Sequence, residues 1–84
     1  MNFAEAWNAL TIGDVISVSD SMPEPSKVGG LPWRAWRSHN FTGTLVAKSD
    51  AQPRRMTFEL APLDGATVRY EIVETIPHSF ETTS

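Results

Sequence analysis

Residues 54–74 decide the predicted fold, and they read RRMTFELAPLDGATVRYEIVE. Apolar and polar side chains alternate on both sides of a central turn, and this period of two predicts strands over 54–61 and 66–75. The turn Pro62–Gly65 combines a proline, an aspartate and a glycine, which together favour a tight reversal of the chain. The stretch therefore predicts an antiparallel hairpin.

Strand parity selects the length of this hairpin loop, because a shift of one residue moves every side chain to the other face. A two-residue loop would place Leu60 opposite Arg69 and mix the two faces. A three-residue loop with a left-handed Gly65 keeps them apart. The predicted register pairs side chains of like character or opposite charge: Leu60 with Val68, Phe58 with Tyr70 and Glu59 with Arg69.

Two further strands and one helix precede the hairpin. Alternation predicts strands over 12–19 and 39–48, and Gly43 in the second marks a bend or a close backbone approach. We expect a helix over 2–11, since Asn2 and Glu5 have the spacing of a capping box. Its apolar stripe, which would cover one end of the sheet, consists of Phe3, Trp7 and Leu10.

The two remaining segments carry weaker patterns. Residues 20–38 contain three prolines and two glycines without apolar periodicity, which predicts a long loop, and loops of this length are often functional. Ile76 and Phe80 predict either a short last strand or a closing turn. Residues 81–84 are expected to fray.

This succession predicts a mainly β fold in a single domain, residues 1–84. Four to five antiparallel strands, with a short N-terminal helix and a long loop after the first strand, resemble the layout of a small SH3-like barrel. The resemblance is one of layout over residues 12–80, and the acidic and aromatic signature of proline-binding SH3 domains is missing. An OB-like barrel is the alternative, although the chain is short for it.

Composition narrows the class of protein. The chain has 84 residues, a net charge of −3 and no cysteine, which excludes a disulfide scaffold and thiolate metal sites. The first residues lack the basic and apolar regions of a signal peptide, and no apolar run reaches the length of a membrane span. We therefore expect a cytoplasmic protein that does not contact membranes.

Tryptophan and arginine are concentrated in the stretch Gly29–Phe41. Three interpretations stay open for Trp33, Arg34, Trp36 and Arg37: a protein interface, packing onto a small core, or nucleic-acid binding. The spacing of three between the tryptophans would suit a single helical turn, with the arginines on another side. Basic residues predominate from Lys27 to Arg55, where Asp50 is the one acid. We therefore add to the candidate binding residues His39, Lys48, Arg54 and Arg55.

Catalytic and metal motifs are not recognisable in the sequence. His39 and His78 lack the spacing of a metal-binding motif, and no nucleophile or phosphate-binding pattern occurs. We therefore expect neither a cofactor, a metal nor enzymatic activity.

The sequence favours a small interaction protein that binds a protein partner through the Trp/Arg-rich loop 29–41. Its small size and lack of motifs would suit a regulatory factor or an accessory factor of a phage or mobile element. The alternative is an SH3-like barrel that binds nucleic acid through the basic and aromatic segment 27–55, although the negative net charge counts against it. A third hypothesis is a homo-oligomer in which the loop packs against a second copy.

Overall fold

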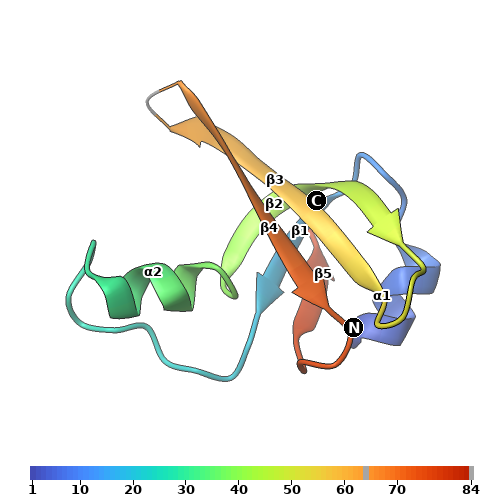
Figure 1. Ribbon diagram of the computed structural model, residues 1–84, viewed down its shortest axis with the longest axis horizontal. Coiled ribbons are helices and arrows are strands. Elements are labelled where there is room, and N and C mark those ends of the chain that lie inside the picture. Colours follow the sequence, from blue (N-terminus) through green and yellow to red (C-terminus); the bar gives the residue numbers. More distant parts are fainter. Residues whose placement is uncertain (64, 84) are drawn as a thin grey trace.

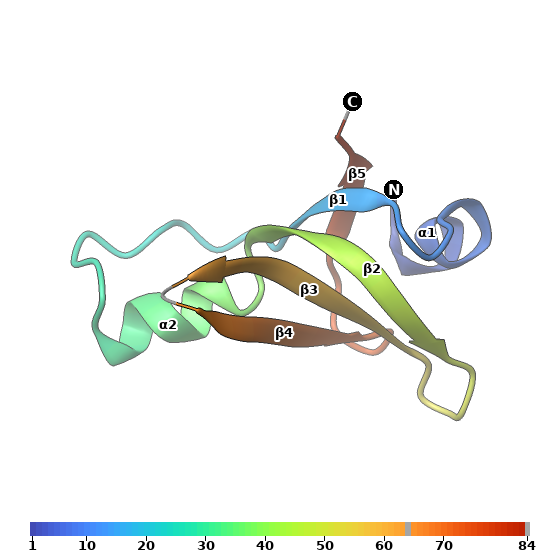
Figure 2. The same cartoon turned by 90° about the horizontal axis from the view of Figure 1, so that it is seen from above.

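A computed structural model describes residues 1–63 and 65–83, and within them the chain forms five antiparallel strands and two short helices. The strands make one open sheet in the order β4-β3-β2-β1-β5. Figures 1 and 2 show this sheet curled, with the two helices at opposite ends of the molecule. The elements in chain order are α1 (Phe3–Ala9), β1 (Val15–Ser19), α2 (Leu31–Arg37), β2 (Phe41–Ser49), β3 (Arg55–Leu63), β4 (Ala66–Val73) and β5 (Ser79–Thr82).

The β3–β4 hairpin has the predicted register. The predicted partners face each other, Leu60 with Val68, Phe58 with Tyr70 and Glu59 with Arg69. Gly65 is left-handed, with φ of 77°. The loop differs from the prediction, because Leu63 pairs directly with Ala66 and a register shift between Leu60 and Leu63 restores the alignment of the faces. Asp64, at the centre of the predicted loop, lies outside the described residues.

Helix α1 begins at the predicted cap. The Asn2 side chain accepts a hydrogen bond from the Glu5 N–H, and the Glu5 carboxylate accepts one from the Asn2 N–H. This reciprocal pair satisfies two of the N–H groups that a helix start leaves without partners. Phe3 and Leu10 are buried and Trp7 is half-buried against the core, so α1 covers one end of the sheet as expected.

The core lies along the inner face of the sheet. Gly43 allows a close approach between strands, because an added Cβ would lie 3.1 Å from the Glu59 carbonyl oxygen. Ile12, the first residue of the predicted strand 12–19, lies instead in the turn before β1 and is 54% exposed. The sheet contributes to the core the side chains of Ile16, Val18, Phe41, Leu45, Met56, Phe58, Leu60, Ile72 and Phe80.

Two expectations about the segments outside the hairpin need correction. The predicted loop 20–38 contains a second helix, α2. The predicted frayed tail is ordered at Glu81 and Thr82, which belong to β5 and pair with β1; Ser84 lies outside the described residues. The sheet itself is open, because its edge strands β4 and β5 do not pair among the described strands, and the SH3-like barrel stays a prediction. Helix and strand ends otherwise fall within three residues of the predicted bounds.

A bulge in β2 changes which side chains face the core. The pairing with β3 shifts between Leu45 and Ala47, so Ala47 is exposed although strict alternation placed it inward. Beyond the bulge, Lys48 turns toward α1 instead of the outer face of the sheet. No helix in the described part of the chain is long and apolar enough to cross a membrane.

Candidate functional site

Helix α2 is where the sequence placed the tryptophans and arginines. It begins after Gly30, and a proline stands in its first turn, where a missing N–H costs nothing. Arg34 and Arg37 lie in the last turn, near the negative end of the helix dipole. These local features explain a seven-residue helix inside a segment whose prolines and glycines predicted a loop.

Helix α2 is lightly packed against the rest of the chain. None of its seven described residues is buried, and Leu31 is 80% exposed. The helix is held by the segment that precedes it: the Trp36 indole N–H donates to the Met22 carbonyl oxygen at 2.9 Å. The Trp33 indole N–H donates to the Glu24 carboxylate at 3.3 Å. Both tryptophans are therefore half-buried, and they fold the loop onto the helix without reaching the core.

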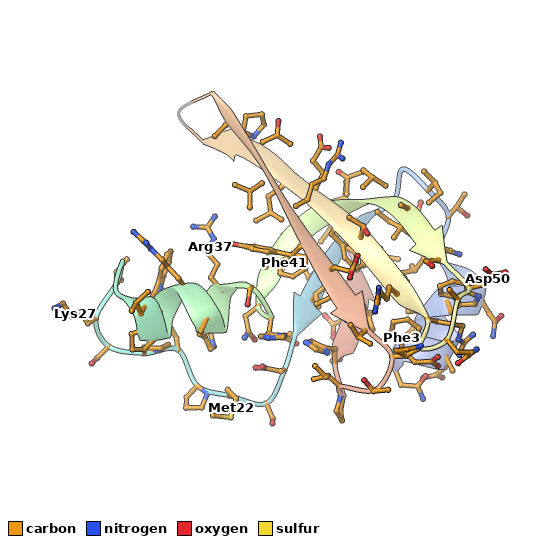
Figure 3. The ribbon with its side chains drawn as sticks, viewed as in Figure 1. Phe3, Met22, Lys27, Arg37, Phe41 and Asp50 are labelled. Atoms are coloured by element: carbon orange, nitrogen blue, oxygen red, sulfur yellow. The ribbon has the colours of Figure 1, made fainter. Side chains whose placement is uncertain are left out.

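Apolar and basic groups lie together around α2. Met22 and Val28 in the adjoining segment are 64% and 69% exposed. The Arg34 side chain is exposed, and the Arg37 guanidinium lies over the Trp33 ring at 5.3 Å. Figure 3 shows Met22, Lys27 and Arg37 along this end of the molecule, far from Phe3 and Asp50. We define the α2 surface as the following residues: Met22, Val28, Leu31, Trp33, Arg34, Trp36 and Arg37.

Two hollows flank the helix. A groove of about 350 Å³ separates α2 from the proline-rich segment and is lined by Met22, Pro23, Pro25, Pro32 and Trp36 together with Asp20, Ala35 and His39. A second hollow of about 210 Å³ lies between α2 and the β3–β4 hairpin, where Arg34 and Arg37 face Tyr70. Concave, mostly apolar surfaces with a few polar groups are typical of binding sites.

The remaining predicted basic residues lie at the other end of the sheet, next to α1. The Lys48 ammonium group donates to the carbonyl oxygens of Trp7 and Leu10. Arg54 forms an ion pair with Glu74 at 3.1 Å, and Arg55 forms a looser one with Glu71 at 3.6 Å. The sequence segment 27–55 therefore does not form one continuous basic face, and these cations already have partners.

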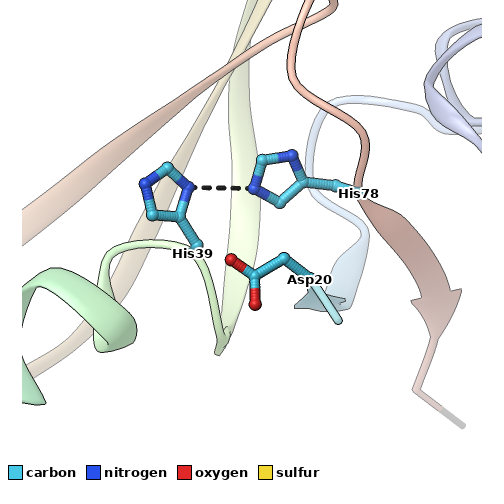
Figure 4. A group of neighbouring side chains, drawn as sticks. All are labelled: Asp20, His39 and His78. Atoms are coloured by element: carbon cyan, nitrogen blue, oxygen red, sulfur yellow. Dashed lines mark hydrogen bonds between the residues drawn. The ribbon is translucent and has the colours of Figure 1, made fainter. Parts of the chain in front are cut away.

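His39 has a different environment from the α2 surface. It follows α2 directly and is half-buried, with its Nδ1 2.9 Å from Nε2 of His78. The two imidazole rings are stacked, with centroids 5.1 Å apart. Figure 4 shows the Asp20 carboxylate beside this pair. One ligand atom from each of Asp20, His39 and His78 lies within 4.8 Å of the other two.

The neighbours of this cluster define its hydrogen-bonding pattern. His78 is 8% exposed, and its Nδ1 lies 2.9 Å from the Ile76 carbonyl oxygen, so this nitrogen carries a hydrogen and donates it. With both rings neutral, Nε2 of His78 is then an acceptor, and His39 Nδ1 donates to it. Burial alone would raise the pKa of Asp20, but hydrogen bonds from the Asn40 side chain and the Met22 N–H lower it below its usual value.

Sequence reasoning included His39 in the binding residues and missed its partners. Asp20, His39 and His78 are far apart in the sequence, and no local spacing connects them. The strand register does connect them. Continuing the β1–β2 register two residues past the pair Val18–Phe41 brings Asp20 opposite His39. Continuing the β1–β5 register one residue past the pair Ser19–Ser79 brings Asp20 opposite His78.

We compared the chain with known protein families, curated proteins and solved structures. No family model, no curated protein and no solved structure matches the chain significantly. The functional argument therefore rests on the residues and their geometry.

Proposed function

We propose that this chain is a non-catalytic interaction domain that binds a protein partner through the α2 surface. The observation that carries the proposal is the light packing of α2: its described residues are all outside the core, and Leu31 is 80% exposed. A helix of seven residues is marginal by itself, so a stable one needs contacts that cover its apolar side chains. A partner would supply those contacts.

The chemistry of the α2 surface favours a partner segment that carries both apolar and acidic side chains. Leu31, Val28 and Met22 offer apolar area that is now in water. Arg34 and Arg37 offer guanidinium groups, which pair well with carboxylates. Tryptophan and arginine are also the residue types most enriched where binding energy concentrates in interfaces. The groove of about 350 Å³ beside Trp36 would accept an apolar anchor from the partner.

Nucleic-acid binding is the weaker alternative. It relies on the basic residues of segment 27–55 acting as one stripe beside the tryptophans. Lys48, Arg54 and Arg55 instead contact groups of this same chain at the α1 end. The chain also carries a net charge of −3. Only three basic residues of this segment remain near α2, namely Lys27, Arg34 and Arg37. If they bound phosphates, the affinity for nucleic acid would fall only slowly with salt concentration.

The same proposal includes an SH3-like arrangement of the strands and a regulatory or accessory role. An SH3-like arrangement is supported by the order of a first strand, a long connection and a three-stranded meander, and by β5 returning to pair with β1. A regulatory or phage accessory role in the cytoplasm would suit an interaction domain of this size. Backbone hydrogen bonds between β4 and β5 in solution would establish the barrel.

Affinity capture with matched variants tests the proposed function. Leu31→Ser with Arg34→Glu changes two exposed residues of the α2 surface, and Arg55→Glu changes one exposed residue at the α1 end. The wild-type chain and the Arg55→Glu variant are expected to retain the same partner from an extract of the source organism, and the α2 variant to lose it. Equal retention by all three chains would contradict the proposal.

A further inference from the structure

We propose that Asp20, His39 and His78 bind a divalent transition-metal ion, with Zn²⁺ as the best-fitting ion. Two imidazole nitrogens and one carboxylate oxygen are donors that zinc accepts, and three protein ligands leave a fourth position for water or an added ligand. Calcium and magnesium prefer sites made of oxygen atoms, so this donor set disfavours them. The site does not depend on the proposed function of the α2 surface.

The geometry is close to that of a zinc site before any rearrangement. Zinc lies about 2.0–2.1 Å from imidazole nitrogen, which places two such nitrogens about 3.3 Å apart in a tetrahedral site. The present distance between His39 Nδ1 and His78 Nε2 is 2.9 Å, so the rings need to separate by a few tenths of an ångström. The Asp20 carboxylate, within 4.8 Å of both, closes the third corner by a side-chain movement.

The surroundings of His78 favour its role as a ligand. Its Nδ1–H is held by the Ile76 carbonyl oxygen, which leaves the lone pair of Nε2 directed at the cluster. Zinc-binding histidines almost always have such a second hydrogen bond, because it fixes the tautomer and the ring orientation. On metal binding, the hydrogen on His39 Nδ1 moves to its Nε2, which frees the Nδ1 lone pair. Both rings then turn slightly, so that the two lone pairs converge on the ion beside the line between the nitrogens.

Asn40 holds the Asp20 carboxylate in place through hydrogen bonds. Its side-chain N–H groups donate to Asp20 Oδ1 at 3.0 Å and to the Trp36 carbonyl oxygen at 2.9 Å. Its own Oδ1 accepts from the Asp20 N–H.

The three ligands come from three separate segments. Asp20 follows β1, His39 follows α2, and His78 lies in the connection between β4 and β5. An ion bound only by the folded arrangement would stabilise the native state by mass action. The bound ion would also hold the C-terminal end of α2 against the sheet, where few contacts exist without it.

The test is a zinc titration of the full chain without a histidine tag, followed by calorimetry and thermal unfolding. Asp20→Asn keeps the carbonyl oxygen that accepts from Asn40 but removes the charge. His39→Gln keeps a donor for the buried His78 Nε2 but is a weak zinc ligand. Asp14→Asn is the matched control, because Asp14 also accepts a backbone N–H, from Thr11, and lies outside the cluster.

The wild-type chain and Asp14→Asn are expected to bind one Zn²⁺ and to melt at a higher temperature when it is present. Asp20→Asn should weaken zinc binding at least about tenfold, and His39→Gln should remove it. Replacement of zinc by Co²⁺ should give the intense visible absorption of a tetrahedral ion. A folded wild-type chain without heat of binding or a melting shift would overturn the proposal. Equal zinc uptake by all the variants would overturn it as well.

Discussion

The ammonium group of Lys48 caps the end of α1, 2.8 Å from the Trp7 carbonyl oxygen and in contact with that of Leu10. The same nitrogen lies 5.5 Å from the centre of the Trp7 ring. The last carbonyl groups of a helix have no partners within the helix, and a cation there also suits the helix dipole. A residue that sequence reasoning assigned to binding therefore has a structural role, which the bulge in β2 makes possible.

Replacing this cation should destabilise the fold. Lys48→Met keeps most of the aliphatic stem but removes both hydrogen bonds, so the free energy of unfolding should fall by about 1–2 kcal/mol. Urea denaturation followed by tryptophan fluorescence measures the change. Lys27→Met is the control, since Lys27 is exposed in the segment before α2 and should shift stability by less than about 0.5 kcal/mol. Equal effects of the two substitutions would refute the capping role.

Gly43 should tolerate no side chain. The Cβ of Gly43→Ala would meet the Glu59 carbonyl oxygen at 3.1 Å and the Leu60 side chain at 3.3 Å, so the paired strands would have to separate. We expect a loss of about 1–3 kcal/mol in thermal or urea unfolding. The control is Gly30→Ala, whose new methyl group meets only Pro32 at 3.7 Å and should cost under about 1 kcal/mol. A neutral Gly43→Ala would show that the strands are less closely packed.

The Glu74 carboxylate should make stability depend on pH. The Arg54 backbone N–H and guanidinium both donate to it, and they lower its pKa below the ordinary value of 4.5. A carboxylate with a lowered pKa in the folded state stabilises the protein above its unfolded pKa, and this contribution disappears as the pH falls through the folded pKa. Glu74→Gln should therefore lower the urea midpoint at neutral pH and approach the wild type in acid.

The control for this experiment is Glu71→Gln, which removes an exposed partner of Arg55 at 3.6 Å. Exposed ion pairs contribute little, so its urea midpoint should stay close to that of the wild type at every pH. A difference between wild type and Glu74→Gln that persists unchanged in acid would contradict the assignment.

Much of the fold was predictable because it depends on local patterns. Alternation predicts the strands, and parity predicts the partners of Leu60, Phe58 and Glu59, which the register confirms. The capping box of Asn2 and Glu5 is likewise a local signal. The bulge between Leu45 and Ala47 was not predictable, since an extra residue in one strand depends on how both strands pack.

The candidate sites were harder to predict than the fold. Pro32 in the first turn and the spacing of Trp33 and Trp36 were compatible with α2, but the many prolines and glycines of 20–38 outweighed them. The three interpretations of the tryptophans required either exposed or core side chains. The structure has both half-buried, with hydrogen bonds to Met22 and Glu24. The cluster around His39 needed the pairing of three strands, which single-sequence patterns do not contain.

The third hypothesis, self-association, makes a separate prediction. If the α2 surface packs against a second copy, sedimentation should give a dimer at high protein concentration, and Leu31→Ser should return it to a monomer. We expect a monomer instead, because the proposed partner of the α2 surface is a different protein. A dimer that Leu31→Ser abolishes would move the interface to a second copy of this chain.

Photo-cross-linking from one position at a time tests the central claim most directly. A photoreactive side chain replaces Leu31 in one variant and Ala51 in another, and both positions are exposed. Leu31 begins α2, whereas Ala51 lies in the turn between β2 and β3, which Figure 1 shows at the α1 end of the molecule. In extract of the source organism, Leu31 is predicted to give one specific adduct with a different protein, lost on adding excess unmodified chain, and Ala51 none. Adducts from Ala51 alone, or equal adducts from both, would contradict binding through the α2 surface.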